Sequence, residues 1–213
     1  MITRFVCLAN SLKEGGRCIA GIELDQFHKP IFQNDLPKWI RPVCSTEYGE
    51  IPIQHAIAFD LLDVLEMNVT GPKAAGYQSE NVSFDPPFSK VGTFNMADLA
   101  NCCDHRCTLF GNRGKAISVD SIASLDHSLV MISVDHLNVE LRSTEGRRNK
   151  PQLRACFEYG DMYYDLPVTD PIFRERIIQN PRELEGKESI YLCVSIGIPY
   201  EGWHYKLVAG VFY

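Results

Sequence analysis

The chain has 213 residues, of which 45% are hydrophobic and 23% charged, and its formal net charge is −6. This composition excludes a disordered polar chain. The acidity argues against non-specific coating of nucleic acid, which needs many contacts from Lys and Arg to phosphate. The longest apolar runs, such as "SLVMISV", are too short to span a membrane, and the first residues show no secretory signal. We therefore expect a cytoplasmic protein with one large domain or two small ones.

The eight cysteines do not indicate a disulfide framework. Most of them lie inside apolar, strand-like runs, for example Cys7 in "RFVCLA" and Cys193 in "YLCVSIG". Without an export signal the thiols are expected to stay reduced, and a free Cys in such a run behaves as a small buried hydrophobe.

The N-terminal half consists of short β-like runs separated by turn signals. The runs "TRFVCLAN" and "RCIAGIEL" surround "SLKEGG", which predicts a hairpin. "WIRPVC" predicts a further strand, and Pro42 places an edge or a strand end there. "FDLLDVLEMNV" favours a strand, although the spacing of Asp60, Asp63 and Glu66 leaves a helix open. No helix is obvious in "STEYGEIPIQHAIA".

The middle of the chain is the least regular part. "NMADLANCCDH" predicts one short helix, capped by Asn95 or Thr93. We expect an N-terminal OB-like domain at 1–95, a connector of helix and loop at 96–125, and a C-terminal OB domain at 126–213.

The C-terminal part begins with "SLVMISVDHLNVEL", which predicts one long strand. A hairpin follows, in which "QLRACFEY" and "MYYDLPV" meet across Gly160-Asp161.

A helix is then predicted in "TDPIFRERIIQNPREL". Thr169 or Asp170 caps it, Pro171 occupies its first position, and Pro181 kinks or ends it. Its expected apolar stripe consists of Ile172, Phe173, Ile177 and Ile178.

Two strands, "SIYLCVSIG" and "HYKLVAGVFY", complete the chain. The order strand, strand, strand, helix, strand, strand is that of the five-stranded OB barrel. The predicted fold class is therefore mainly β, with two OB-like five-stranded barrels and a few short helices, the first barrel being less regular.

Several segments resemble the dual OB-containing domain family of bacteria. In the N-terminal half these are "CLANSLKEGGRCIAG", "WIRPV", "GE" at 49–50, "LLDVLEM" and "YQSEN". In the C-terminal half they are "LPVTDP" and "YLCVSIGIPYEGWHYKLVAGV". The resemblance implies two OB barrels that bind nucleic acid or a nucleotide, in a defence or conflict system. It transfers no catalytic residues, and a fold does not establish a function.

The stretch 141–155 carries five basic residues against one acid, Glu145, in an acidic chain. In an OB barrel it forms the loop between the first and second strands, and "GIPYEGWHY" forms the loop between the fourth and fifth. These two loops frame the ligand face of OB folds. Cations on one loop and aromatic rings on the other suit a single-stranded nucleic acid. The alternatives are a solvated basic loop and a Trp203 that plugs one end of the barrel.

The residues of this predicted binding site fall into two groups. The phosphate contacts are Arg147, Arg148, Lys150 and Arg154, with Arg142 as a further member. The stacking groups are Tyr163, Tyr200, Trp203 and Tyr205, with His204 beside them.

The N-terminal half offers secondary candidates. Lys13 and Arg17 surround Gly15-Gly16, where backbone amides can approach a phosphate, although a tight hairpin explains the same residues. Trp39 and Arg41 share one face of their strand and could stack over a ligand, although a Trp39 half in the core explains the pattern equally.

Metal binding and catalysis have weak signals. Cys102, Cys103, His105 and Cys107 form a metal-like cluster, but no second Cys/His pair follows, so we predict no metal and no cofactor. No catalytic motif joins the available nucleophiles, His residues and acids, which favours a protein that is not an enzyme.

The sequence thus predicts a non-catalytic OB protein that binds single-stranded nucleic acid or a nucleotide and no membrane. One alternative is a protein-interaction subunit of a defence or toxin system, in which exposed aromatic residues anchor a protein partner. The other is an enzyme acting on a nucleotide or a modified base.

Overall fold

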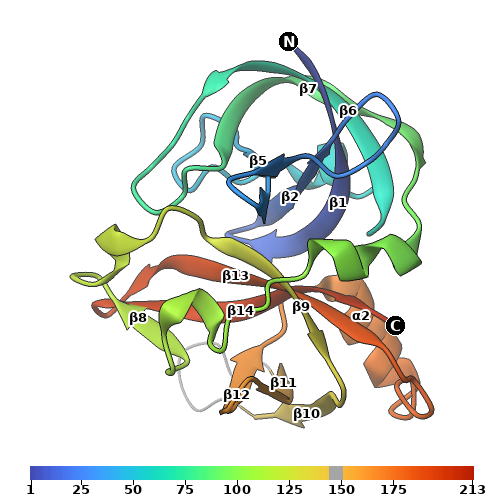
Figure 1. The fold of residues 1–213 in the computed structure, drawn as a ribbon, viewed down its shortest axis with the longest axis vertical. Coiled ribbons are helices and arrows are strands. Elements are labelled where there is room, and N and C mark those ends of the chain that lie inside the picture. Colours follow the sequence, from blue (N-terminus) through green and yellow to red (C-terminus); the bar gives the residue numbers. More distant parts are fainter. Residues whose placement is uncertain (144–150) are drawn as a thin grey trace. The chain divides into compact units, whose positions relative to one another are not determined.

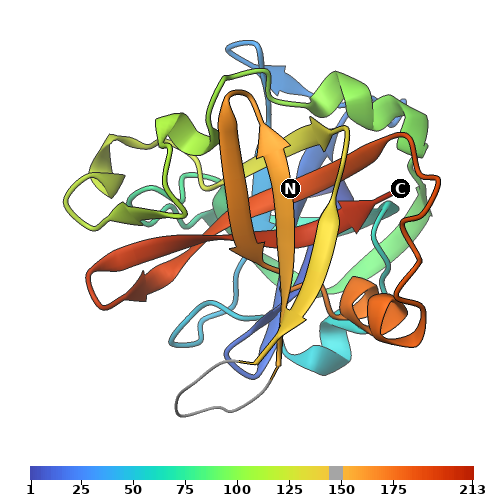
Figure 2. The ribbon, with the colours of Figure 1, turned by 90° about the horizontal axis from the view of Figure 1, so that it is seen from below.

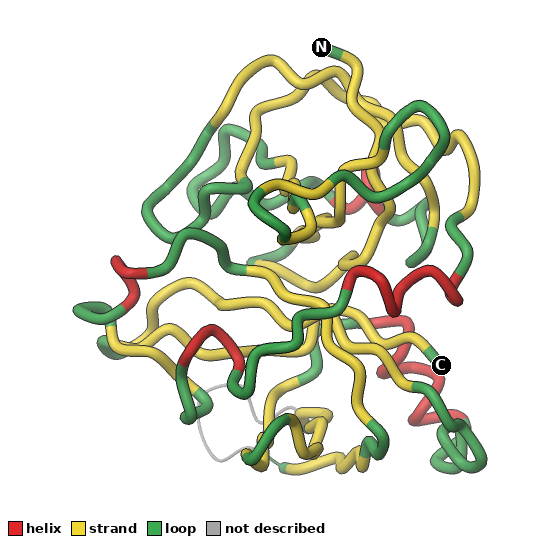
Figure 3. Tube along the Cα trace, viewed as in Figure 1, coloured by secondary structure: helices red, strands yellow, loops and turns green. Residues whose placement is uncertain are grey.

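The computed structural model describes residues 1–143 and 151–213. The chain forms two compact units. The N-terminal unit comprises Met1–Cys102 with Ser124–Ser128, and the C-terminal unit comprises Cys103–Ala123 with Leu129–Tyr213. Strands dominate both units (Figures 1 and 3), which confirms the predicted fold class. The division at residues 95 and 125 stays a prediction. Among the described helices, none has the length and apolar character that crossing a membrane requires.

Five strands close a barrel in the N-terminal unit: β1 (Ile2–Lys13), β2 (Gly16–Leu24), β5 (Trp39–Pro42), β6 (Asp63–Pro72) and β7 (Asn81–Thr93). Their order is β1-β2-β5-β7-β6, and β6 returns to β1. Neighbouring strands are antiparallel except β5 and β7, which are parallel. This Greek-key order is that of an OB barrel. The run 59–69, for which a helix remained open, is therefore mostly strand.

The first hairpin depends on a close approach between β1 and β2. The pairing shifts by one residue between Cys7 and Ala9. A Cβ at Gly21 would lie 1.7 Å from the carbonyl oxygen of Val6. Only glycine allows this approach, so the pairing of β1 with β2 requires Gly21 within the apolar run "CIAGI".

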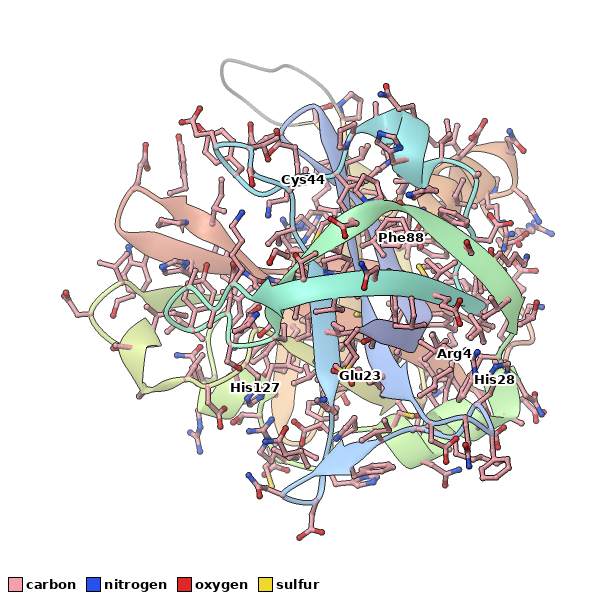
Figure 4. All side chains as sticks on the ribbon, turned by 90° about the horizontal axis from the view of Figure 1, so that it is seen from above. Arg4, Glu23, His28, Cys44, Phe88 and His127 are labelled. Atoms are coloured by element: carbon pink, nitrogen blue, oxygen red, sulfur yellow. The ribbon has the colours of Figure 1, made fainter. Side chains whose placement is uncertain are left out.

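Aromatic side chains fill much of the N-terminal core. The rings of Phe84 and Phe88 stack with their centroids 4.7 Å apart, and Phe5 and Phe59 meet Phe88 edge-on. Phe88 lies on β7, which arches across the barrel in Figure 4. Such contacts add to the stabilisation that burial of apolar surface provides.

A single helical turn, α1 (Ile53–Ala56), lies between the third and fourth strands of this barrel. The sequence showed no helix here, because a four-residue turn is too short to produce helical periodicity. Ala56 is its one buried residue, and no side chain caps its start. A two-stranded hairpin, β3 (Phe32–Gln33) and β4 (Leu36–Pro37), connects β2 to β5.

Between the barrels the chain forms short elements. The run predicted as a helix is a 3-10 helix, η1 (Met96–Cys102), and the Asn95 side chain accepts a hydrogen bond from the amide of Ala97 at 3.1 Å. The other elements are η2 (Leu109–Gly111), β8 (Ala116–Ser118) and η3 (Ile122–Ser124).

The C-terminal unit contains two sheets. One has the order β10-β11-β12, formed by β10 (Asn138–Arg142), β11 (Gln152–Tyr159) and β12 (Met162–Pro167). The other has the order β8-β14-β13-β9, with β9 (Leu129–Val134), β13 (Ile190–Tyr200) and β14 (Trp203–Phe212). A parallel bridge between Val168 and Val208 connects the end of β12 to β14. Figure 2 shows β10, β11 and β12 side by side.

The long strand predicted at 128–141 is wrong as a single element. The chain leaves the extended pairing at residues 135–137, so β9 pairs with β13 and β10 pairs with β11. One sequence run therefore serves two sheets. Apolar alternation continues on both sides of the break, so the sequence pattern alone does not reveal it.

The helix α2 (Pro171–Gln179) begins and ends where the sequence predicted. The Asp170 side chain accepts hydrogen bonds from the amides of Ile172 and Phe173, both at 3.0 Å. Phe173 and Ile177 are buried, whereas Ile172 and Ile178 are exposed by about half. The buried face of α2 is therefore narrower than the predicted apolar stripe, because Phe173 and Ile177 alone of the four residues pack against the rest of the C-terminal unit.

A buried ion pair joins the third strand of the N-terminal barrel to the start of its fifth. The Arg41 and Glu80 side chains are each 2% exposed, and their Nη1 and Oε1 atoms lie 3.2 Å apart. The amide of Arg41 donates to the carbonyl of Glu80 at 2.9 Å, and the Ser128 hydroxyl donates to the same carboxylate. Removing one partner of such a pair leaves the other charge buried without compensation.

We expect Glu80→Gln to lower the free energy of unfolding by about 3–5 kcal/mol, because Arg41 would keep its charge in a site closed to water. Urea denaturation of the wild type and the variant measures this difference. Glu185→Gln is the control, because its pair with Arg182 is exposed on both sides, and such pairs contribute less than about 1 kcal/mol. Equal losses in the two variants would contradict the expectation.

Candidate functional site

A projecting hairpin at the junction of β13 and β14 presents aromatic side chains. The turn Glu201-Gly202 has φ angles of +50° and +82°, which suit a two-residue hairpin turn. Tyr200 and Trp203 are directly paired across the turn, so both side chains point to the same face. Tyr200 is 64% exposed and Trp203 is 47% exposed. The alternative in which Trp203 plugs the barrel is therefore wrong.

Tyr205 lies on the same face as Trp203, because alternate residues of a strand share a side. It is half-buried and pairs with Ala116 of β8, while Trp203 pairs with Ser118. We call Tyr200, Trp203 and Tyr205 the aromatic hairpin face. Three rings that the sequence proposed for stacking thus lie on one hairpin.

His204 does not belong to this face, and its predicted place in the site is wrong. Alternation along β14 turns His204 to the opposite side, where it is 4% exposed. Its Nδ1 lies 3.0 Å from the carbonyl oxygen of Gly197. The imidazole is therefore a buried, hydrogen-bonded group.

Tyr163 is exposed, but it lies in the other sheet of the unit. It pairs with Glu158 across β11 and β12, and its side chain is 62% exposed. A hydrogen bond with Cys156 raises the pKa of the Tyr163 hydroxyl. Within the described residues, no hydrogen bond or ring contact joins Tyr163 to the aromatic hairpin face.

The arginines predicted to contact phosphate from β10 and β11 are engaged by carboxylates. The Arg142 guanidinium lies 2.6 Å from Asp165 and 2.8 Å from Glu140, and Arg154 Nε lies 2.8 Å from Asp165. Burial alone would raise the pKa of Asp165, but the hydrogen bonds from Arg154 and Arg142 outweigh it and lower that pKa.

This network changes the charge expected on the sheet β10-β11-β12. Register places Arg142, Arg154, Glu140, Asp165 and Glu158 on the same side of the three strands. Two positive charges therefore face three negative ones. A phosphate would have to displace carboxylates from both arginines, so this part of the site is not the free basic surface that the sequence suggested. The remaining basic residues of the prediction, Arg147, Arg148 and Lys150, lie outside the described residues.

The secondary candidates of the N-terminal unit do not form one site. The Trp39–Arg41 stack over a ligand is wrong, because the Arg41 side chain is buried with Glu80 while Trp39 is half-buried opposite Ile22.

Lys13 and Arg17 lie near the first hairpin turn. Lys13 is half-buried, and burial lowers the pKa of its amine. Arg17 donates from Nη1 to the carbonyl oxygen of Asn10 at 3.1 Å. That contact ties the Arg17 side chain to the hairpin itself, in agreement with the tight-hairpin alternative.

The metal-like cluster does not assemble in the described part of the chain. There, no three His, Cys, Asp or Glu side chains come close enough to hold a metal ion. Cys102 is buried, and burial raises the pKa of its thiol to about 11, whereas Cys107 and His105 are exposed. The alternative assignment of Cys102, Cys103, His105 and Cys107 as ligands is therefore not supported. All eight cysteines are free thiols.

The sequence did not single out Lys206, a lysine with no exposed surface in the C-terminal unit. Its Nζ donates to the carbonyl oxygens of Asn112 and Gly114, both at 2.7 Å, and to Asn112 Oδ1 at 3.1 Å. It also lies 5.2 Å from the centre of the Tyr164 ring. Burial lowers the pKa of Lys206 to about 7. The sequence did contain a sign that Lys206 is buried. In the alternating strand that contains it, Lys206 falls on the same face as the inward-pointing His204 and Val208.

Tyr164 holds the same segment. Its hydroxyl accepts a hydrogen bond from the amide of Leu109 at 3.1 Å and donates to the carbonyl oxygen of Asn112 at 3.3 Å. Lys206 and Tyr164 therefore fix residues 109–114 onto the inner side of the C-terminal unit.

We expect the stability of the C-terminal unit to rise between pH 7 and pH 10. The pKa of Lys206 is about 7 in the folded protein against 10.5 for an ordinary lysine, so in this range the unfolded chain binds a proton that the folded protein does not. The free energy of unfolding then increases with pH, by at most about 1.4 kcal/mol per pH unit for one proton.

Urea denaturation followed by Trp203 fluorescence tests this, with Trp39→Phe in every protein so that one of the two tryptophans remains. The reference is Lys206→Met, which removes the titrating group and should lose this rise. The same pH dependence in both proteins would show that Lys206 keeps an ordinary pKa.

Two OB-type units, one a closed barrel and one opened into two sheets, define the class of this protein. The family model described as dual OB-containing domain matches residues 3–211, and the chain belongs to that family. The predicted resemblance is thereby confirmed.

Among solved structures, the chain is similar to a murine DNA-binding protein bound to double-stranded DNA. The identity is 5% and the TM-score 0.36, over 100% of this chain and 95% of the other. A likeness at this level carries no argument about ligand or mechanism. No curated protein matches the chain.

Proposed function

We propose that the chain binds single-stranded nucleic acid through its C-terminal unit and catalyses no reaction. The observation that carries this proposal is the pair Tyr200 and Trp203, which face the same way from the tip of the hairpin between the fourth and fifth OB strands. In OB folds this loop frames the ligand face. Exposed rings there provide flat surfaces on which unpaired bases stack.

The choice of a single strand follows from the side chains present. Bases of a duplex are already stacked on one another, whereas unpaired bases offer both of their faces to aromatic rings. The net charge of −6 and the neutralised arginines of β10 and β11 limit the contribution of phosphate contacts. Stacking therefore supplies most of the affinity. A nucleotide would use the same rings with a single base, and the defence context implied by the family resemblance fits either ligand.

We expect the double variant Tyr200→Ala, Trp203→Ala to bind short single-stranded DNA and RNA about 100-fold more weakly than the wild type, because each stacked base contributes about 1–3 kcal/mol. Fluorescence anisotropy at low salt measures the affinities. The control is Phe27→Ala, Tyr48→Ala, which removes two exposed rings from the N-terminal unit and should leave affinity unchanged.

Absence of binding by the wild type, or equal affinity in the two double variants, would overturn the proposal. Repeating the titration at moderate salt separates nucleic-acid binding from the protein-interaction alternative. Affinity that depends on attraction to phosphate weakens as salt rises, whereas the affinity of an aromatic protein interface changes little.

The basic stretch of the sequence has its own test in the same assay. We expect Arg147→Ala, Arg148→Ala to weaken binding and to make it less dependent on salt. On a single strand the salt slope should fall by about 0.7 for each phosphate that these arginines neutralise in the wild type. An unchanged affinity and an unchanged slope would assign these residues to a solvated loop.

A further inference from the structure

The described part of the C-terminal unit holds four Lys or Arg side chains with neither an ion pair nor a hydrogen-bond acceptor: Arg113, Lys115, Arg174 and Lys187, of which Lys187 lies 5.3 Å from the centre of the Tyr213 ring. Arg174 lies on α2. Arg113 and Lys115 are exposed, and they lie on either side of Gly114 in one turn. Two positive charges without internal partners are therefore concentrated in one short segment of an acidic protein.

This turn adjoins the aromatic hairpin face. It leads directly into β8, in which Ala116 pairs with Tyr205 and Ser118 pairs with Trp203. The carbonyl oxygen of Lys115 accepts a hydrogen bond from the backbone amide of residue 206 at 2.9 Å. The turn is thus attached by its backbone to β14, next to the strand residues that carry the rings. Figures 1 and 2 show β8 and the tip of the hairpin at the same edge of the sheet.

The turn is also held from its inner side. The carbonyl oxygens on either side of Arg113, those of Asn112 and Gly114, both accept from Lys206 Nζ at 2.7 Å. The Asn112 side chain further accepts from the amide of Gly114 at 2.9 Å. These bonds fix the backbone without using the Arg113 or Lys115 side chains. A cation carried on an ordered turn loses less entropy when it binds than one on a free loop.

We infer that Arg113 and Lys115 form a phosphate-binding turn, which contacts the sugar-phosphate backbone of the single strand whose bases stack on the aromatic hairpin face. Lys206 is the positioning residue that holds this turn. The inference rests on the proposed function and adds the group that binds phosphate. It adds cations from the segment before β8 to those that the sequence indicated in the loop after β10.

The experiment compares the double variant Arg113→Ala, Lys115→Ala with the control Arg174→Ala, Lys29→Ala. Both remove two positive charges that have no partner within the described residues, so both change the net charge equally. Affinity for a short single-stranded DNA is measured by anisotropy between about 50 and 200 mM salt. We expect the first variant to bind about tenfold more weakly at low salt, with a salt slope smaller by about 1.4, because two phosphates keep their counterions in its complex. The control should keep the wild-type slope.

A third variant, Lys206→Met, tests the positioning role. It keeps all three rings and both exposed cations, so a reduced salt slope in a protein that still unfolds cooperatively indicates a displaced turn. A wild-type slope in folded Lys206→Met would overturn the positioning role. If this variant does not fold, the double variant decides the inference.

The outcomes also separate this inference from the proposed function. If the wild type binds and loss of Tyr200 and Trp203 weakens binding as expected, while Arg113→Ala, Lys115→Ala keeps the wild-type slope, the phosphate-binding turn is overturned and the stacking function stands. If the wild type does not bind, the proposed function fails and the inference fails with it.

Discussion

A charge removed from water must find its partners inside the fold. Each unit of this protein buries such a charge where two of its strands meet, β5 and β7 in the N-terminal barrel and β12 and β14 in the C-terminal unit. In the N-terminal barrel, Arg41 of β5 pairs with Glu80, which immediately precedes β7. In the C-terminal unit, Lys206 of β14 lies against the ring of Tyr164 in β12. The two solutions differ. Arg41 has a carboxylate, whereas Lys206 is satisfied by oxygens of one turn.

The hydrogen bonds of Lys206 connect the interior of the C-terminal unit to its surface. Because Lys206 binds the carbonyl oxygens of Asn112 and Gly114, moving the turn between them would leave the buried Lys206 amine with unmade hydrogen bonds. The surface next to the aromatic hairpin face is therefore attached to the strand that carries the rings by both side-chain and backbone hydrogen bonds. A buried lysine of this kind is costly for stability, and its local effect is to hold the segment that leads into β8.

The charge distribution shows why a basic pattern in sequence is not a basic surface in structure. Arg142 and Arg154 come from different strands and meet at Asp165 of a third strand, so that one carboxylate serves two guanidinium groups. Two exposed cations of this unit without an ion pair or a hydrogen-bond acceptor in the described residues, Arg113 and Lys115, instead precede β8, in a part of the chain where the sequence showed no regular pattern. Counting charges along the chain identifies cations, whereas only the register of the strands decides which of them are already neutralised.

The sequence by itself determined the strand-rich class, the order of strands and helix in the C-terminal half, the capping of α2 by Asp170 and the hairpin turn at Gly160-Asp161. These features depend on residues close together in the chain, on alternation along a strand and on the chemistry of turns and caps. Only the tertiary structure decided that one apolar run is divided between β9 and β10, that His204 and Arg41 are buried, and that Lys206 is held by a turn more than ninety residues earlier. Those outcomes depend on which strands become neighbours, and pairing between distant segments leaves no periodic signal in the sequence of either one.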